Sequence, residues 1–87
     1  VLNGKAIDFP QPVYPAVAKA ARQEGTVTVQ VTVDEGGRVI SARAVSGPPL
    51  LQTSAVEAAY RARFPPTKLS GQPVKVTGVV TYNFRLP

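Results

Sequence analysis

Residues 26 to 34 read TVTVQVTVD, and this stretch carries the clearest structural pattern in the chain. Valine stands at every second position from Val27 to Val33, with threonine or glutamine between. A period of two with β-branched residues is typical of a strand that buries one face. We therefore predict a half-buried strand whose valines face the core and whose exposed positions are Thr26, Thr28, Gln30 and Thr32.

The stretch continues into a turn and a second strand. Residues 34–37 read Asp-Glu-Gly-Gly, and glycine accepts the positive φ that hairpin turns require. Residues 38–46 are expected to return beside the first strand, with Ile40, Ala42 and Ala44 on its inner face. The turn lacks the alternating oxygen ligands of a calcium loop. Its glycines lead into a strand and not a helix, so they predict no phosphate cradle either.

Helical patterns stand on both sides of this hairpin. Pro15 suits a first helical turn, and the alanine-rich residues after it predict a helix of about ten residues that ends near Gly25. A second helix is expected after Gly47-Pro48-Pro49, and the pair Pro65-Pro66 should end it at Phe64. Its apolar residues recur at helical spacing, namely Leu51, Ala55, Ala58, Ala59 and Ala62.

The end of the chain predicts a loop at residues 67–73 and a long third strand at residues 74–85. One face of this strand should hold Val74, Val76, Val80, Tyr82 and Phe84. The other should hold Lys75, Thr77, Val79, Thr81, Asn83 and Arg85. Gly78 interrupts the inner face, which indicates a bulge or a close backbone approach.

The expected order of elements is thus α-β-β-α-β. A right-handed crossover through the second helix places the third strand beside the first and antiparallel to it. We predict an α+β, two-layer domain: a three-stranded antiparallel sheet of order 2-1-3, with two helices on one face. Strands two and three are then the edges. The proline-containing residues 1–13 are expected to be an irregular segment, the end of a linker, and residues 14–87 to be the domain.

Composition excludes several classes of function. The chain of 87 residues holds no histidine and no cysteine, which excludes the usual zinc sites, thiol catalysis and histidine acid–base chemistry. Its carboxylates form no constellation, so we expect no catalytic residue, no metal and no cofactor. No apolar run approaches the ~20 residues of a membrane span, and no membrane contact is expected. The abrupt start at Val1, without signal-peptide features, indicates a fragment of a longer protein.

The charge balance is basic, with 10 basic and 5 acidic residues. Such a balance suits nucleic acid, an anionic envelope surface or an acidic partner. Sheets that bind RNA place aromatic residues on their exposed face, whereas the exposed positions of the first strand here hold threonine and glutamine, so no nucleic-acid partner is expected. The long third strand is a further candidate surface, because its outer face is neither strongly charged nor interrupted by proline. It can accept an extended peptide or pair with a second copy, and the residues leave both open.

Several short stretches resemble one known family when taken together. They are Gln11-Pro12-Val13-Tyr14-Pro15, Gly25-Thr26-Val27, residues 31–39, Val45-Ser46-Gly47, Arg63-Phe64-Pro65-Pro66, Gly71-Gln72-Pro73-Val74 and Tyr82-Asn83-Phe84. In this order and spacing, from about residue 11 to residue 86, they resemble the C-terminal domain of TonB-type energy transducers.

The resemblance implies a function. It implies a periplasmic, non-enzymatic domain of a protein anchored in the inner membrane. This domain would bind the TonB-box segment of an outer-membrane transporter as an added strand. An ExbB/ExbD-like motor would act through the N-terminal part that is missing from this chain. The implied docking strand comprises Val79, Val80, Thr81, Tyr82, Asn83, Phe84 and Arg85, with Gln11 near the docked segment.

The chain departs from the family pattern at two positions. Ala62 stands where many members carry tryptophan, and Val17 stands where some carry a basic residue. Partner specificity is therefore expected to differ from that of better-known members. The alternative function is a structural cell-envelope module that binds peptidoglycan or another periplasmic protein. A homodimer that exchanges third strands is a further alternative.

Overall fold

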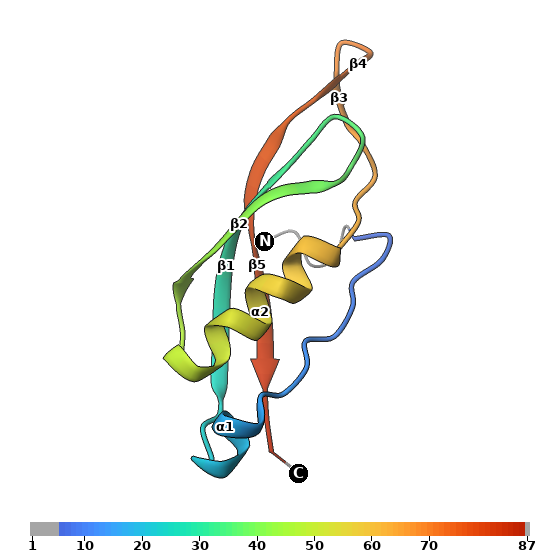
Figure 1. Cartoon of the computed structure of the whole chain (residues 1–87). Helices are drawn as coiled ribbons and strands as arrows, with labels where there is room; N and C mark the ends of the chain where they lie inside the picture. The colour runs from blue at the N-terminus through green and yellow to red at the C-terminus, as the bar shows by residue number, and fades with distance from the viewer. Residues whose placement is uncertain (1–5, 87) are drawn as a thin grey trace.

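The computed structural model describes residues 6–86 (Figure 1). Its elements are, in chain order, α1 (Ala16–Ala20), β1 (Gly25–Val33), β2 (Val39–Ser46), α2 (Pro49–Arg61), β3 (Thr67–Leu69), β4 (Gln72–Val74) and β5 (Val76–Phe84). Neither helix within the described residues is long and apolar enough to cross a membrane.

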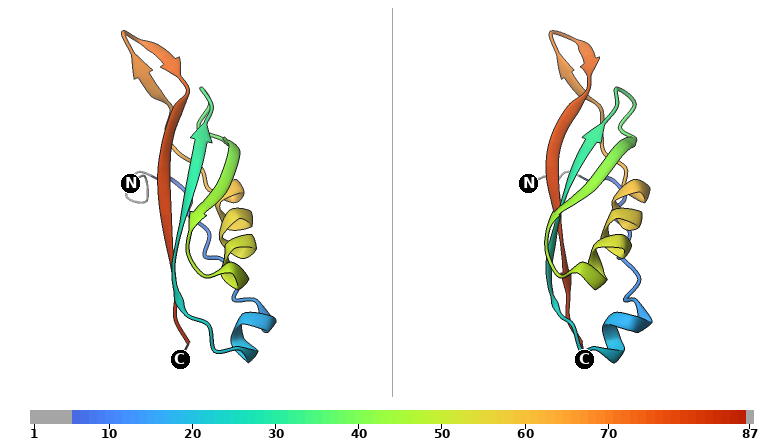
Figure 2. Two further views of the ribbon diagram at one scale, coloured as in Figure 1. Left: turned by 90° about the vertical axis from the view of Figure 1, so that its left-hand side faces the viewer. Right: turned by 60° about the vertical axis from the view of Figure 1, so that its left-hand side comes forward.

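The main sheet has the order β2-β1-β5, and both pairings are antiparallel. With β5 counted as the third strand, this is the predicted order 2-1-3. Both helices lie on one side of the sheet, so the predicted two-layer α+β fold is confirmed (Figures 1 and 2). The pairing of β1 with β5 continues without a shift through Gly78, which excludes a bulge there.

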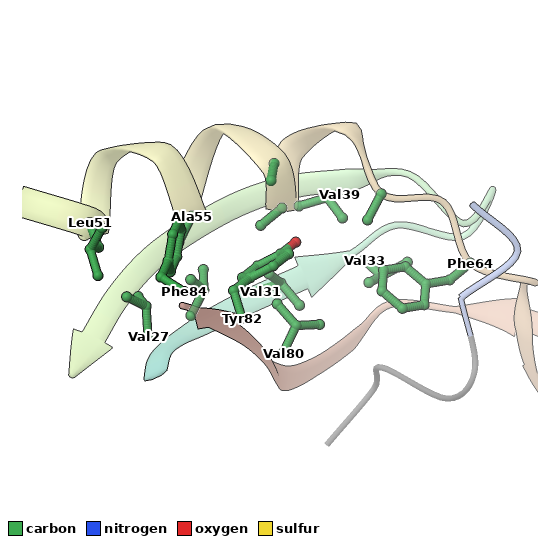
Figure 3. Packing of buried hydrophobic residues seen from close by; sticks show 14 of the residues in the cluster. Val27, Val31, Val33, Val39, Leu51, Ala55, Phe64, Val80, Tyr82 and Phe84 are labelled. Carbon is green, nitrogen blue, oxygen red and sulfur yellow. The ribbon is translucent and has the colours of Figure 1, made fainter. Parts of the chain in front are cut away.

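The core lies between α2 and the sheet, where side chains from β1, β2, α2 and β5 converge (Figure 3). The four valines of β1 are all buried, as their alternation predicted. The face of α2 that meets the sheet is largely alanine, and small side chains allow a helix to lie close to a sheet. Leu51 is its largest buried residue. The predicted helical stripe is buried throughout, comprising Leu51, Ala55, Ala58, Ala59 and Ala62.

The inner face of β2 differs from the prediction. The register between β1 and β2 shifts twice, and each shift leaves one extra residue in β2, first Ile40 and then Val45. Both side chains are about half exposed, at 49% and 50%. The prediction that Ile40 lies on the inner face was wrong, because the bulge turns it outward and Val39 enters the core instead. Ala42 and Ala44 do pack against the core.

Helix α1 is shorter than predicted, with five residues. Its C-cap is Ala21, and Arg22 then takes a left-handed conformation with φ of 53°. This reversal lets the Gln23 N–H donate to the Ala18 carbonyl at 2.9 Å. The prediction that the helix continues to Gly25 was wrong, because Arg22 takes the left-handed role and Gly25 begins β1.

Residues 67–74 form a second sheet, the hairpin β3–β4, where a loop was predicted. Ser70 and Gly71 connect its strands with φ of 51° and 79°, and two residues with positive φ match a tight hairpin turn. Val74 therefore belongs to β4, and the third strand of the main sheet begins at Val76 and not at residue 74. The hairpin projects beyond the main sheet (Figure 1).

Candidate strand-docking site

Strand β5 lies at one edge of the main sheet. Its register with β1 runs unbroken from Gly25 opposite Phe84 to Val33 opposite Val76. Within residues 6–86, no strand pairs with the other side of β5. A regular strand of nine residues that, among residues 6–86, pairs with another strand on one side only is a template to which another extended chain can add.

A contact in β2 reveals which backbone groups of β5 face outward. The Ala42 N–H donates to the Tyr60 hydroxyl at 3.2 Å and therefore points away from β1. Ala42 pairs with Val31, so the backbone groups of Val31 point towards β5. Because this direction alternates along antiparallel strands, the backbone groups of Val80 face β1 and those of Val79 face the outer side.

The opposite edge of the sheet is closed. The bulges at Ile40 and Val45 interrupt the regular backbone of β2. The Tyr60 hydroxyl, which comes from α2, already accepts from the Ala42 N–H on that edge. Bulges and covering side chains are the means by which natural sheets prevent a further strand from pairing. The two edges are therefore unequal: β2 is interrupted by bulges and contacted by Tyr60, whereas the pairing of β5 is regular.

Residues 6–14, which we call the strap, cover the inner face of β5. Helix α2 lies mainly over β2 and β1, so it covers little of β5. The Phe9 ring stacks on Tyr82, with 5.1 Å between ring centroids and 1° between ring planes. The Tyr14 ring meets Phe84 edge-on at 5.6 Å. The inner face of β5 is thus aromatic and covered by the chain's own N-terminal side.

Burial raises the pKa of the Tyr82 hydroxyl. Its side chain is 3% exposed, and its hydroxyl has no hydrogen-bond partner among residues 6–86. Desolvation raises the pKa of Tyr82 to about 12, and the positive charge of Arg61 opposes this rise only in part. At neutral pH the Tyr82 side chain is therefore uncharged and packs as part of the inner face of β5.

The outer face beside β5 carries short polar side chains. The Thr26 hydroxyl donates to the Asn83 side-chain oxygen at 2.7 Å, and the hydroxyls of Thr32 and Thr77 lie 3.4 Å apart. No residue within β5 is charged. An added strand would therefore meet hydroxyl and methyl groups on this face and backbone groups at its edge.

The predicted site residues fall into three places. Those from Val79 to Phe84 lie in β5, and Arg85 follows it as an exposed residue. Val80, Tyr82 and Phe84 point into the core and are buried. Gln11 is an exposed residue of the strap, between the two aromatic residues that contact β5. The structure thus brings the segment that carries Gln11 onto β5.

Sequence reasoning missed two residues that shape the site. Phe9 covers Tyr82, although the sequence predicts the end of a linker there. The sequence shows only an aromatic residue next to a proline at this position. That pattern does not predict which residue the aromatic ring contacts. Tyr60 caps β2, and no local pattern predicts a contact between residues 18 positions apart.

Together, the fold and this edge define a small α+β domain whose distinctive surface is a regular edge strand that pairs with β1. Within residues 6–86, no group of three or more His, Cys, Asp or Glu is placed to hold a metal ion.

Comparison with known proteins places this domain in a family. The sequence model of the family described as Gram-negative bacterial TonB protein C-terminal matches residues 10–86, and the chain belongs to that family. The chain is also similar to the solution NMR structure of the Pseudomonas aeruginosa TonB C-terminal domain. The TM-score is 0.73 at 27% identity, over 94% of this chain and 85% of that chain. No curated protein matches. The resemblance in the sequence is thereby confirmed.

Proposed function

We propose that this domain docks the TonB-box segment of an outer-membrane transporter by strand addition to β5, and that it transmits energy derived from the proton gradient for active uptake. The observation that carries the proposal is the inequality of the two sheet edges. β2 is bulged and capped by Tyr60, whereas β5 is regular and paired on one side. Membership of the TonB C-terminal family supports the same assignment.

The proposal also covers the location of the domain in the cell and the motor that drives it. The domain acts in the periplasm as part of a protein anchored in the inner membrane. An ExbB/ExbD-like motor drives it through residues that precede this chain. The docking residues are Val79, Val80, Thr81, Tyr82, Asn83, Phe84 and Arg85, with Gln11 beside the docked segment.

The energetics suit a contact that is made and broken repeatedly. A docked segment of about six residues forms roughly 4–6 backbone hydrogen bonds, each contributing about 0.5–1.5 kcal/mol net. Association and ordering of the segment cost several kcal/mol in return. The resulting affinity is modest, and the pairing is reversible.

The test is an NMR titration of the isotope-labelled domain with a synthetic peptide that carries a TonB-box segment from a transporter of the same organism. We expect shifts concentrated from Val79 to Arg85 and near Gln11. If several such peptides cause no shifts at millimolar concentration, the docking function is wrong.

Two proline variants sharpen this titration. In Val79→Pro the lost N–H faces outward, and proline is tolerated on an edge strand in that orientation, so the domain should stay folded while peptide binding falls at least tenfold. In Val80→Pro the lost N–H faces β1, so the domain itself should be destabilised. Val79→Ala keeps the backbone donor and should bind almost normally. A folded Val79→Pro variant with unchanged affinity would contradict docking at β5.

A second candidate function rests on the formal net charge of +5. A basic surface suits a structural envelope module that binds peptidoglycan or another anionic periplasmic partner. A homodimer formed through β5 is a third candidate, because the open edge accepts a second copy by the same pairing. Sedimentation at several protein concentrations separates the monomer from this dimer.

A further inference from the structure

The strap is attached to the body of the domain at a few separate points. At its start, the Ile7 and Asp8 N–H groups donate to the Arg63 carbonyl at 2.7 and 3.2 Å. The Arg63 N–H donates to the Asp8 carbonyl at 2.8 Å, which completes an isolated antiparallel bridge. Arg63 lies just beyond α2, so this bridge fixes the strap to the end of the helix.

The remaining attachments lie further along the strap. Phe9 stacks on Tyr82, the Ser54 hydroxyl donates to the Val13 carbonyl, and the Tyr14 hydroxyl donates to the Gln23 carbonyl. They join the strap to β5, to α2 and to the residues before β1. Tyr14 also meets Phe84 edge-on, and none of these contacts forms part of a regular ladder.

The sheet is held differently. β1 and β5 form one continuous ladder across nine residue pairs, and the valines of β1 pack beneath α2. Segments with few contacts open locally at lower free energy than a continuous ladder over a packed core. The strap should therefore open at a lower free energy than the sheet.

We propose that the strap is a tension-sensitive latch. A pull from the N-terminal side detaches residues 6–14 before the sheet yields, and thereby uncovers Tyr82 and Phe84 behind the docking strand. The inference rests on the proposed function for its source of tension. The load on the chain then determines how long the strap covers β5. It thereby also determines how long β5 holds a docked segment.

The test pulls single molecules of the whole chain with magnetic tweezers, through handles at the two termini and without peptide. We expect a first extension of at most about 30 Å, the length of nine extended residues at ~3.4 Å each, before the domain unfolds. At a fixed force, Phe9→Ala should open the strap about tenfold faster, because it removes the aromatic pair. Ile7→Ala is the matched control, since the Ile7 side chain is 72% exposed, and should change the rate less than twofold.

A crosslink provides the decisive comparison. The chain has no cysteine, so the double variant Asp8→Cys, Arg63→Cys contains a single thiol pair. Residues opposite each other in an antiparallel bridge have Cα atoms about 4.5–5.5 Å apart, within the range that a disulfide spans. Oxidation should abolish the first extension, and reduction should restore it.

Three results would overturn the latch. They are a wild-type chain that unfolds in one stage, a first extension that persists in the oxidised variant, and an equal effect of Ile7→Ala and Phe9→Ala. Because no peptide is present, failure of the latch is distinguishable from failure of docking, which the NMR titration measures separately.

Discussion

The position of Gly37 shows how a single residue holds the hairpin turn against the end of α2. Gly37 has φ of 87°, and a Cβ atom at this position would lie 1.9 Å from the Phe64 carbonyl oxygen. The Phe64 N–H also donates to the Gly37 carbonyl at 2.9 Å, so the two backbones cannot separate without losing that bond. The Asp34 carboxylate fixes the turn by accepting from the Arg38 N–H at 2.8 Å.

Replacement of Gly37 by alanine should therefore be severe. We expect Gly37→Ala to lower the free energy of unfolding by about 2–4 kcal/mol, from backbone strain and displacement of Phe64. Gly71→Ala is the control, because Gly71 has φ of 79° but a Cβ atom there would meet nothing within 4 Å. It should cost only about 1 kcal/mol of strain. Urea denaturation of both variants checks this, and equal losses would show that the contact with Phe64 is unimportant.

The raised pKa of Tyr82 predicts that the stability of the domain depends on pH. The unfolded chain loses this hydroxyl proton near pH 10, whereas the folded chain keeps it until about pH 12. The unfolded state thus binds fewer protons in this window, and stability falls as pH rises through it. The wild type should lose at most about 3 kcal/mol more between pH 9 and pH 12 than Tyr82→Phe does. Denaturation at several pH values measures both, and parallel curves would contradict the assigned shift.

At the scale of elements, the contact between α2 and β2 should protect one backbone amide. Tyr60→Phe removes the only acceptor assigned to the Ala42 N–H within the described residues. We expect hydrogen exchange at Ala42 to accelerate at least tenfold, while the free energy of unfolding changes by less than about 1.5 kcal/mol. Exchange at Val31 should stay slow, because its amide pairs with β5. Unchanged protection at Ala42 would mean that the hydroxyl does not close this edge.

The elements differ in how well the sequence predicts them, and the reason is physical. β1 is central and half-buried, so burial imposes the strict alternation from which it was predicted. β2 lies at an edge, where bulges are tolerated, and no residue type marks Ile40 as the extra residue. The sequence of the strap shows no hydrophobic periodicity. Isolated contacts hold this segment, and they impose no repeating pattern of burial on it. Helix α1 ended early because Arg22 adopted a conformation usually left to glycine.

In the whole molecule, the candidate site depends on contacts between elements that lie far apart in the chain. The sequence predicts the strand order and the two edges, and the family resemblance assigns docking to residues 79–85. The contact of α2 with β2 distinguishes the two edges, and the strap covers the inner face of β5. Both contacts join residues far apart in the chain. These relations arise from tertiary packing, which local pattern does not contain.

The distribution of charge over the molecule gives a last prediction, which separates the two proposed functions. Basic residues occur in α1, β2, α2 and β3, and none lies within β5. Docking at β5 joins neutral backbone groups, which salt screens little, whereas binding of an anionic surface relies on exposed charges that salt screens strongly. With a TonB-box peptide whose termini are blocked, the dissociation constant should change less than about threefold between 50 and 500 mM NaCl. Lys68→Ala with Lys75→Ala, both exposed and outside β5, should leave that affinity unchanged. A steep loss of affinity with salt, together with an effect of these lysines, would favour the envelope module, because only a charged surface contact responds to both changes.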